Sequence, residues 1–306
     1  MIAPLLFAGL VPSLGAEEGN LMPSVFDYDR VLVTPTLMNG DSLRFYTDSG
    51  GGFNAIKRSV ADKLGAASAS EVIDLPSFVD GSSIPANPIF KNGQLQVVED
   101  DVLSQHYDGF LGGRWFGNRI WEFDYETKRL ILHDKLPIAV TEPMAGLSLG
   151  FQVGEDRLRT MHFPRLPVSI DGKEIQVLFD TGATATLTDS SADYFDRAAG
   201  DGIGISFMCQ EVFDQWRSDH PDWPYLERAD AVGRGKLPMI QVAEVEMAGL
   251  VSGPVWFAKR PNSAFKRYMT QFMDQEVCGA IGGSALKYFH LVIDYPAANL
   301  WLRLTD

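Results

Sequence analysis

The chain has 306 residues, of which 45% are hydrophobic, enough for two domains of ordinary size that each have a core of their own. With only two cysteines, folding cannot depend on a dense disulfide framework. The formal charge of -14 argues against a nucleic-acid partner, because no basic stripe is present to neutralise phosphates.

The first sixteen residues are apolar and end in small residues before Glu17. They resemble the later part of a secretory signal, with cleavage near Gly15 or Ala16, although a positively charged start is missing. This interpretation predicts a secreted or periplasmic protein. The alternative is an apolar N-terminal strand that packs on the fold. No later run is long enough to span a membrane.

Short runs rich in Val, Ile, Leu and aromatic residues follow, separated by turn signals such as Asn39-Gly40 and Asp171-Gly172. They predict strands at 29–37, 42–47, 94–100, 120–125, 129–134, 166–171, 175–180, 239–247, 253–258, 290–295 and 300–305. Short helices are expected at 57–65, 191–200, 211–216 and 263–275. The sequence therefore predicts an all-β class, mainly β with short helices.

Two tripeptides each follow a predicted strand, Asp48-Ser49-Gly50 in the first half and Asp180-Thr181-Gly182 in the second. Each aspartate would lie where a strand turns into a loop. One such tripeptide is a weak signal, since a turn or a helix cap explains it equally well. Two of them could bring two carboxylates together, and a close pair shares one proton and becomes an acid and a base at once.

The segments around the two tripeptides repeat. The 24 residues from Gly109 align without a gap on those from Gly279 at an offset of 170, and the tripeptide blocks align at an offset of 132. The order of blocks is the same, so the chain is interpreted as an internal duplication. The second half has 38 more residues between its blocks, and we expect them as one insertion near 201–236.

The expected organisation is a first lobe at 21–142 with Asp48 and a second lobe at 143–306 with Asp180. The connection is placed between His133 and Gly150, a stretch that contains Pro137 and Pro143.

With its two repeated tripeptide segments and the repeated segments from Gly109 and Gly279, the chain resembles the pepsin and retropepsin superfamily of aspartic peptidases. The motif Phe179-Asp180-Thr181-Gly182-Ala183 matches that family's hydrophobic-Asp-Thr-Gly pattern, and the Gly-rich and Asp-Tyr blocks resemble later strands of each pepsin lobe. The resemblance covers about two thirds of the chain. It implies two β-rich lobes, a long cleft between them, and one catalytic aspartate from each.

The residues suggest how such a site would work. One carboxylate of Asp48 and Asp180 takes a proton from water while the other donates to the scissile carbonyl. Hydroxyls of Ser49 and Thr181 can bond to the opposite loop, and Gly50 and Gly182 allow tight turns. Where the family often has Ser or Thr, this chain has Gly51 and Ala183, so the pair has fewer hydrogen bonds and a weakly acidic pH optimum is expected.

The first motif departs from the family pattern. Thr47 precedes Asp48, and Gly51 and Gly52 follow Gly50. Three glycines in a row suggest a loosened loop. The family's flap, a hairpin with a Tyr near its tip, is best matched by the hairpin around Phe78, which lacks that Tyr. Phe78 is therefore a candidate for substrate binding, with simple hairpin packing as the alternative. A second candidate for the flap is the hairpin with Ala248-Gly249 at its turn.

Other kinds of site have little support. The five histidines lack metal-ligand spacing, and no Gly-x-Ser-x-Gly nucleophile elbow is present, so no metal and no cofactor are expected. Asp124 and Asp294 are expected in exposed turns or strand ends. Cys209 and Cys278 would form a disulfide in an exported protein and remain free thiols in a cytosolic one.

Two functions remain. The first is an aspartic endopeptidase that acts as a monomer on extended polypeptide substrates, with no nucleic-acid partner and no membrane span. The second is a protein of the same fold that has lost turnover and binds a peptide or a partner protein.

Overall fold

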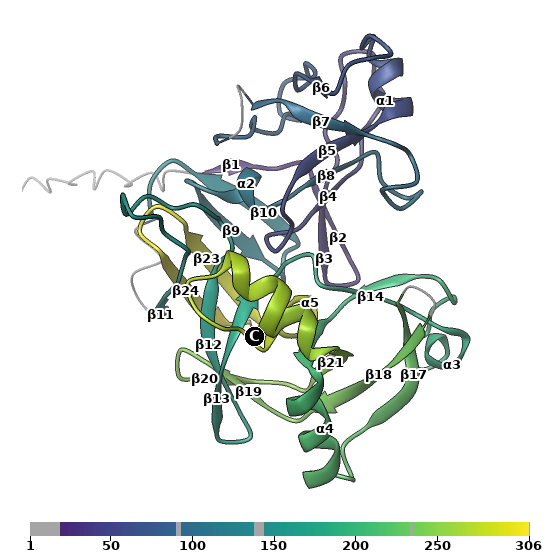
Figure 1. Ribbon diagram of the computed structural model, residues 1–306. Coiled ribbons are helices and arrows are strands. Elements are labelled where there is room, and N and C mark those ends of the chain that lie inside the picture. Colours follow the sequence, from purple (N-terminus) through teal and green to yellow (C-terminus); the bar gives the residue numbers. More distant parts are fainter. Residues whose placement is uncertain (1–18, 90–92, 138–143, 233–234, 306) are drawn as a thin grey trace, which may run out of the picture.

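The computed structural model describes residues 19–89, 93–137, 144–232 and 235–305. It is mainly β and two-lobed, with 41% strand and 14% helix, so the predicted fold class is confirmed (Figure 1). Segment 1–16, interpreted as a signal, and Pro143 of the expected connection lie outside the described residues. Among the described helices, none is long and apolar enough to cross a membrane.

The first half of the chain builds a seven-stranded sheet with the order β2-β3-β4-β8-β5-β7-β6. Its strands are β2 Ser24–Asp27, β3 Arg30–Val33, β4 Phe45–Thr47, β5 Asn54–Lys57, β6 Val72–Ile73, β7 Leu95–Val98 and β8 Gly109–Leu111. β3, β4 and β5 are buried along their whole length, which explains why their sequences lack an alternation of polar and apolar residues.

The second half builds a nine-stranded sheet with the order β17-β18-β21-β16-β22-β13-β12-β19-β20, and a separate pair β14-β15. The strands are β12 Arg165–Ile170, β13 Lys173–Phe179, β14 Thr184–Thr186, β15 Gly202–Gly204, β16 Ser206–Cys209, β17 Tyr225–Val232, β18 Gly235–Val242, β19 Val245–Met247, β20 Leu250–Ser252, β21 Val255–Arg260 and β22 Gly279–Ile281. β12 shows strict alternation, with Leu166, Val168 and Ile170 buried.

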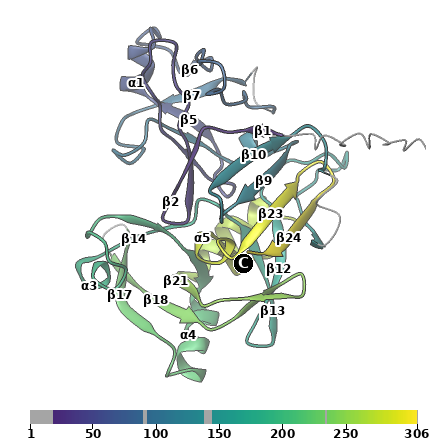
Figure 2. The same cartoon turned by 180° about the vertical axis from the view of Figure 1, so that it is seen from behind.

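A third sheet joins the two halves, with the order β1-β10-β9-β23-β24-β11 (Figure 2). Its strands are β1 Asn20–Leu21, β9 Ile120–Asp124, β10 Arg129–His133, β11 Ala145–Ser148, β23 Phe289–Asp294 and β24 Asn299–Leu304. β9 and β23 pair antiparallel in its middle, so backbone hydrogen bonds hold the two halves together. Asp124 and Asp294 end these strands as expected, but they are buried rather than exposed, and each accepts a hydrogen bond from a backbone N–H of the following turn.

The helices are short and lie at the ends of strands. They are α1 Arg58–Lys63, α2 Gly113–Phe116, α3 Asp189–Ala192, α4 Gln210–Asp219, α5 Gly283–Leu286, a π-helix η3 Ser263–Tyr268 and a 3-10 helix η4 Met269–Phe272. All four predicted helical regions contain or overlap one of these elements. α3 begins earlier than expected, because Thr188 and Ser191 form a capping box at its start.

The hydrogen bonds of the two halves repeat at the offsets found in the sequence. The backbone N–H of Asp48 donates to Leu111 at 2.9 Å, and that of Asp180 donates to Ile281 at 2.9 Å. These equivalences reproduce the offsets of 132 and 170. The pairing of β4 with β8 is parallel, as is that of β13 with β22. The structure therefore supports the interpretation of an internal duplication.

The strand pairings correct the expectation of one insertion near 201–236. Ala55 of β5 pairs with Phe110 as Phe207 of β16 pairs with Ala280, which gives an offset of 152. β7 pairs with β5 as β21 pairs with β16, so Gln96 corresponds to Ala258, an offset of 162. The 38 residues are thus divided into 20 before β16, 10 between β16 and β21, and 8 before β22. The largest addition is β14, α3 and β15, directly after the Asp180 loop.

Candidate functional site

The two aspartates occupy equivalent loops at the ends of β4 and β13. In each loop the backbone N–H of the glycine two residues later donates to the carboxylate, from Gly50 to Asp48 at 2.8 Å and from Gly182 to Asp180 at 3.0 Å. The sequence reasoning expected a strand end followed by a tight turn. The structure has this arrangement at both positions.

Hydroxyl groups connect the two loops. Ser49 Oγ accepts from the backbone N–H of Thr181 at 2.9 Å and donates to the carbonyl of Phe179 at 2.8 Å. Thr181 Oγ1 accepts from the backbone N–H of Ser49 at 3.1 Å. Both side chains are fully buried. The predicted exchange of hydroxyl bonds between the loops is present, and it fixes the two halves against each other.

Each loop glycine packs directly against the opposite aspartate. A Cβ added to Gly182 would lie 2.3 Å from Cγ of Asp48, and one added to Gly50 would lie 2.8 Å from Cγ of Asp180. Real Cβ atoms do not approach other atoms so closely. The glycines are therefore required for the close approach of the two loops. The structure brings Asp48 and Asp180 together with all four residues predicted to support them.

The surroundings raise the pKa of both carboxyl groups. Burial raises the pKa of Asp180 well above its usual value of 3.8, and the nearby Asp48 raises it further. Burial also raises the pKa of Asp48, while its bonds to Asp180 and to the backbone N–H groups of Gly50 and Gly51 partly oppose this shift. Such a pair holds one proton more easily than two negative charges. The arrangement provides one acid and one base at the same place.

Gly51, the first of the two extra glycines, is closely packed, contrary to the expectation of a loosened loop, whereas Gly52 is exposed. A Cβ on Gly51 would lie 2.5 Å from the ring of Phe110 and 3.1 Å from Cγ of Asp48. The carbonyl of Gly51 also accepts from the backbone N–H of Gly113 at 2.8 Å. Gly51 thus makes room for the aromatic ring of Phe110. The loop is held by packing.

The contacts of Phe78 are those of packing. Its backbone forms a single bridge with Leu37, and its half-buried side chain packs against the main hydrophobic core. A turn is present at Asp80-Gly81, but no pair of strands surrounds it. The other candidate hairpin, β19 and β20, lies at the edge of the nine-stranded sheet opposite β17. The packing alternative for Phe78 agrees with these contacts, and substrate binding by Phe78 stays a prediction.

Sequence reasoning missed Tyr46, which lies on β4 two residues before Asp48. Its hydroxyl contacts the carbonyl of Gly182 and Oγ1 of Thr184, both at 2.5 Å. Its ring stacks on Tyr107 at 4.9 Å between centroids. The available signal was the period of two along a strand, which places Tyr46 and Asp48 on the same face.

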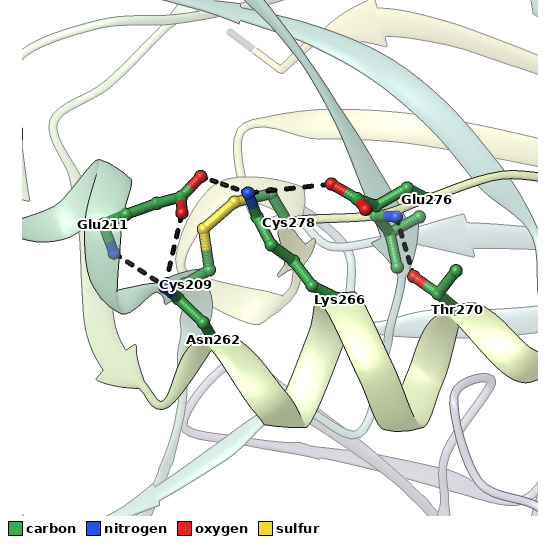
Figure 3. Close-up of a disulfide and its surroundings, with 8 residues drawn as sticks. Cys209, Glu211, Asn262, Lys266, Thr270, Glu276 and Cys278 are labelled. Carbon is green, nitrogen blue, oxygen red and sulfur yellow. Dashed lines mark hydrogen bonds and ion pairs between the residues drawn. A yellow bond between two sulfur atoms is a disulfide. The ribbon is translucent and has the colours of Figure 1, made fainter.

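A disulfide joins Cys209, at the start of α4, to Cys278, just before β22 (Figure 3). Of the two alternatives left open by the sequence, the structure contains the bonded one. Beside it, Lys266 lies between Glu211 and Glu276 (Figure 3). A hollow of about 550 Å³ borders Cys278, lined by residues of α4, β13 and the segment before β22. No residue of either aspartate loop lines it.

Solved structures that resemble the chain include two distant neighbours. A retropepsin-like aspartic protease from Rickettsia conorii has 15% identity and a TM-score of 0.31, covering 52% of this chain and 90% of its own. Conglutin gamma, a basic 7S globulin from lupine seeds, has 8% identity and a TM-score of 0.48, covering 94% and 96%. No protein-family model and no curated protein matches the chain. At these scores neither neighbour carries an argument about function, which must come from the site.

Proposed function

We propose that the protein is an aspartic endopeptidase that hydrolyses peptide bonds with water activated by Asp48 and Asp180. One observation carries the proposal: the buried carboxylate of Asp180 and the half-buried one of Asp48 lie on equivalent loops, which the hydroxyls of Ser49 and Thr181 connect. An internal duplication explains why the two loops are equivalent. It does not explain why both loops keep an aspartate where burial disfavours the charged carboxylate.

The proposed reaction needs only groups of this chain and a water molecule. The ionised carboxylate of the pair removes a proton from water, and the oxygen attacks the carbon of the scissile amide. The protonated carboxyl donates to the carbonyl oxygen. The tetrahedral intermediate then collapses, and its nitrogen leaves as an amine after taking up a proton. No covalent bond to the protein forms.

The raised pKa of both carboxyls sets the expected pH range. The pair must carry one proton in total, and a raised upper pKa extends that state toward neutral pH. We therefore propose a weakly acidic optimum. A peptidase profile that peaks well below pH 4 would contradict this, because an unperturbed aspartate titrates near there.

The decisive experiment uses a mixed peptide library between pH 3 and 8 with the wild type, Asp48→Asn and Asp180→Asn. Both variants keep the side-chain shape and lose the charge. Cleavage by the wild type that disappears in both variants supports the pair. Cleavage that persists in either variant would assign the chemistry to another residue.

A second candidate is a protein of the same fold that binds a peptide or a partner protein without cleaving it. One observation favours it: Phe78 packs in the core, and no pair of strands surrounds the Asp80-Gly81 turn. A region that closes over bound peptide is therefore not evident among the described residues of the first lobe. Saturable binding of library peptides with no cleavage at any pH would support this candidate.

Export from the cytosol is also proposed, because the disulfide of Cys209 and Cys278 fits an oxidising compartment. Signal cleavage near Gly15 or Ala16 would produce a mature N-terminus there. N-terminal sequencing of protein from the culture medium or periplasm tests this. Recovery of uncleaved chain in the cytosol with two free thiols would contradict it.

A further inference from the structure

The hydroxyl of Tyr46 spans the two halves of the molecule. Tyr46 lies on β4, whereas its partners Gly182 and Thr184 follow β13, more than 130 positions later. Thr184 belongs to the 20-residue addition that the first half lacks. Since Tyr46 is 7% exposed, the contact is formed away from solvent. A hydrogen bond of this kind is stronger in such surroundings than in water.

Counting protons determines the direction of both bonds. A carbonyl oxygen can only accept, so the single proton of Tyr46 goes to Gly182. The hydroxyl of Thr184 must then donate to Tyr46. Burial raises the pKa of Tyr46 well above its usual value of 10, and the charge of Asp48 raises it further. Tyr46 therefore remains a proton donor throughout the pH range in which an aspartate pair works.

Gly182 is held from three directions. Its backbone N–H donates to Asp180, its Cα lies against the side chain of Asp48, and its carbonyl accepts from Tyr46. Only the third contact comes from a side chain that can be changed without altering an aspartate. Without the hydrogen bond from Tyr46, the backbone of Gly182 can move away from the side chain of Asp48.

We propose that Tyr46 is a positioning residue: its hydroxyl holds Gly182 against Asp48 and thereby sets the separation of the two carboxylates. Tyr46 touches no reacting atom in this role. As a statement about peptide cleavage, the inference rests on the proposed function. As a statement about the geometry of the pair, it can be tested without substrate.

Among the described residues, Tyr107, Tyr295 and Arg260 interact with Tyr46 or with the aspartate pair. Tyr107 stacks on Tyr46, and its hydroxyl accepts from Arg30 at 2.9 Å. Tyr295 interacts electrostatically with Asp48, and Arg260 interacts with Asp180. Replacing Tyr46 by Phe changes none of these groups. A change in the titration of the pair would therefore come from the lost hydroxyl.

The test compares Tyr46→Phe with Tyr107→Phe, a neighbouring tyrosine that also keeps its ring and loses its hydroxyl. At an effective dielectric constant of about 20, increasing the separation of two carboxylates from about 3 Å to about 4 Å lowers the upper pKa of the pair by about one unit. In Tyr46→Phe we expect the basic limb of the activity profile to move to lower pH by up to this amount. We also expect kcat to fall about tenfold with KM nearly unchanged. Tyr107→Phe should retain the wild-type profile.

Thr184 offers a graded variant pair. Thr184→Ser keeps the hydroxyl and should match the wild type, whereas Thr184→Val removes one of the two bonds of Tyr46. Its shift should have the same direction as that of Tyr46→Phe and be smaller. A shift in Tyr46→Phe that Tyr107→Phe reproduces would overturn the inference, because general loosening would then explain both.

A readout without substrate separates this inference from the proposed function. In protein labelled with ¹³C at aspartate carboxyls, the signals of the pair are identified by their loss in Asp48→Asn and Asp180→Asn. Their upper titration step should fall in Tyr46→Phe whether or not the protein cleaves peptides. If the wild type cleaves nothing but this step falls, the proposed function fails and the positioning role stands. An unchanged step in Tyr46→Phe contradicts the positioning role.

Discussion

The hydroxyl exchange between the two loops predicts unequal costs for two conservative substitutions. Ser49 Oγ serves two buried backbone groups, the carbonyl of Phe179 and the N–H of Thr181. Thr181 Oγ1 serves one, the N–H of Ser49. Ser49→Ala and Thr181→Val each remove the hydroxyl and leave the rest of the side chain similar in shape. Both therefore measure hydrogen bonds more than packing.

The expected magnitudes follow from the number of groups left without a partner. Each buried polar group that loses its partner costs about 1–3 kcal/mol. Ser49→Ala should therefore lower the free energy of unfolding by roughly 2–6 kcal/mol, and Thr181→Val by roughly 1–3 kcal/mol. The larger value is a substantial fraction of the stability of an ordinary domain.

Equilibrium unfolding in urea, followed by tryptophan fluorescence, measures both changes. The m-value should stay constant, so the shift in midpoint reports stability directly. Ser68→Ala, at an exposed position of the first lobe, is the control and should stay within about 0.5 kcal/mol of the wild type. A loss in Thr181→Val equal to or larger than that in Ser49→Ala would refute the reasoning.

Three further predictions concern the same region. Gly182→Ala should abolish peptide cleavage and lower the urea midpoint, because the new Cβ would meet Cγ of Asp48 at 2.3 Å; retained activity would contradict the packing. Replacing Cys209 and Cys278 by Ser opens a loop with a sequence separation of 69 and should cost about 4 kcal/mol in urea unfolding, and a loss below 1 kcal/mol would contradict a structural disulfide. The raised pKa of Asp180 contributes stability that is complete below its unfolded value of 3.8 and is lost as pH rises through its folded pKa. The urea midpoint of the wild type relative to Asp180→Asn should therefore fall from pH 4 toward pH 7, and a rise would contradict the sign.

Much of the site was visible in the sequence because duplication preserves spacing. The offset of 132 identified Asp48 and Asp180 as equivalent, and the offset of 170 identified the strands that support them. The structure has the same donor and acceptor pattern at both loops. The hydroxyl bonds of Ser49 and Thr181 to the opposite loop were predicted from residue type, whereas Gly50 and Gly182 were predicted only for tight turns.

Features that depend on contacts between distant segments were missed. The position of the 38 added residues could not be read from the sequence, since it depends on which strands pair with Phe207. Gly51 was interpreted through backbone freedom, but the ring of Phe110 explains it. Tyr46 lies in the predicted strand at 42–47, yet its partner Thr184 lies in a segment with no equivalent in the first half.

The central claim is that Asp48 and Asp180 act as one catalytic pair. Isothermal titration with a statine-type peptide tests it most directly, because the inhibitor's hydroxyl takes the place of the tetrahedral intermediate between two carboxyls. The account predicts one molecule bound per chain of the wild type, and binding weakened at least a hundredfold in both Asp48→Asn and Asp180→Asn. Equal affinity in the wild type and either variant would contradict it.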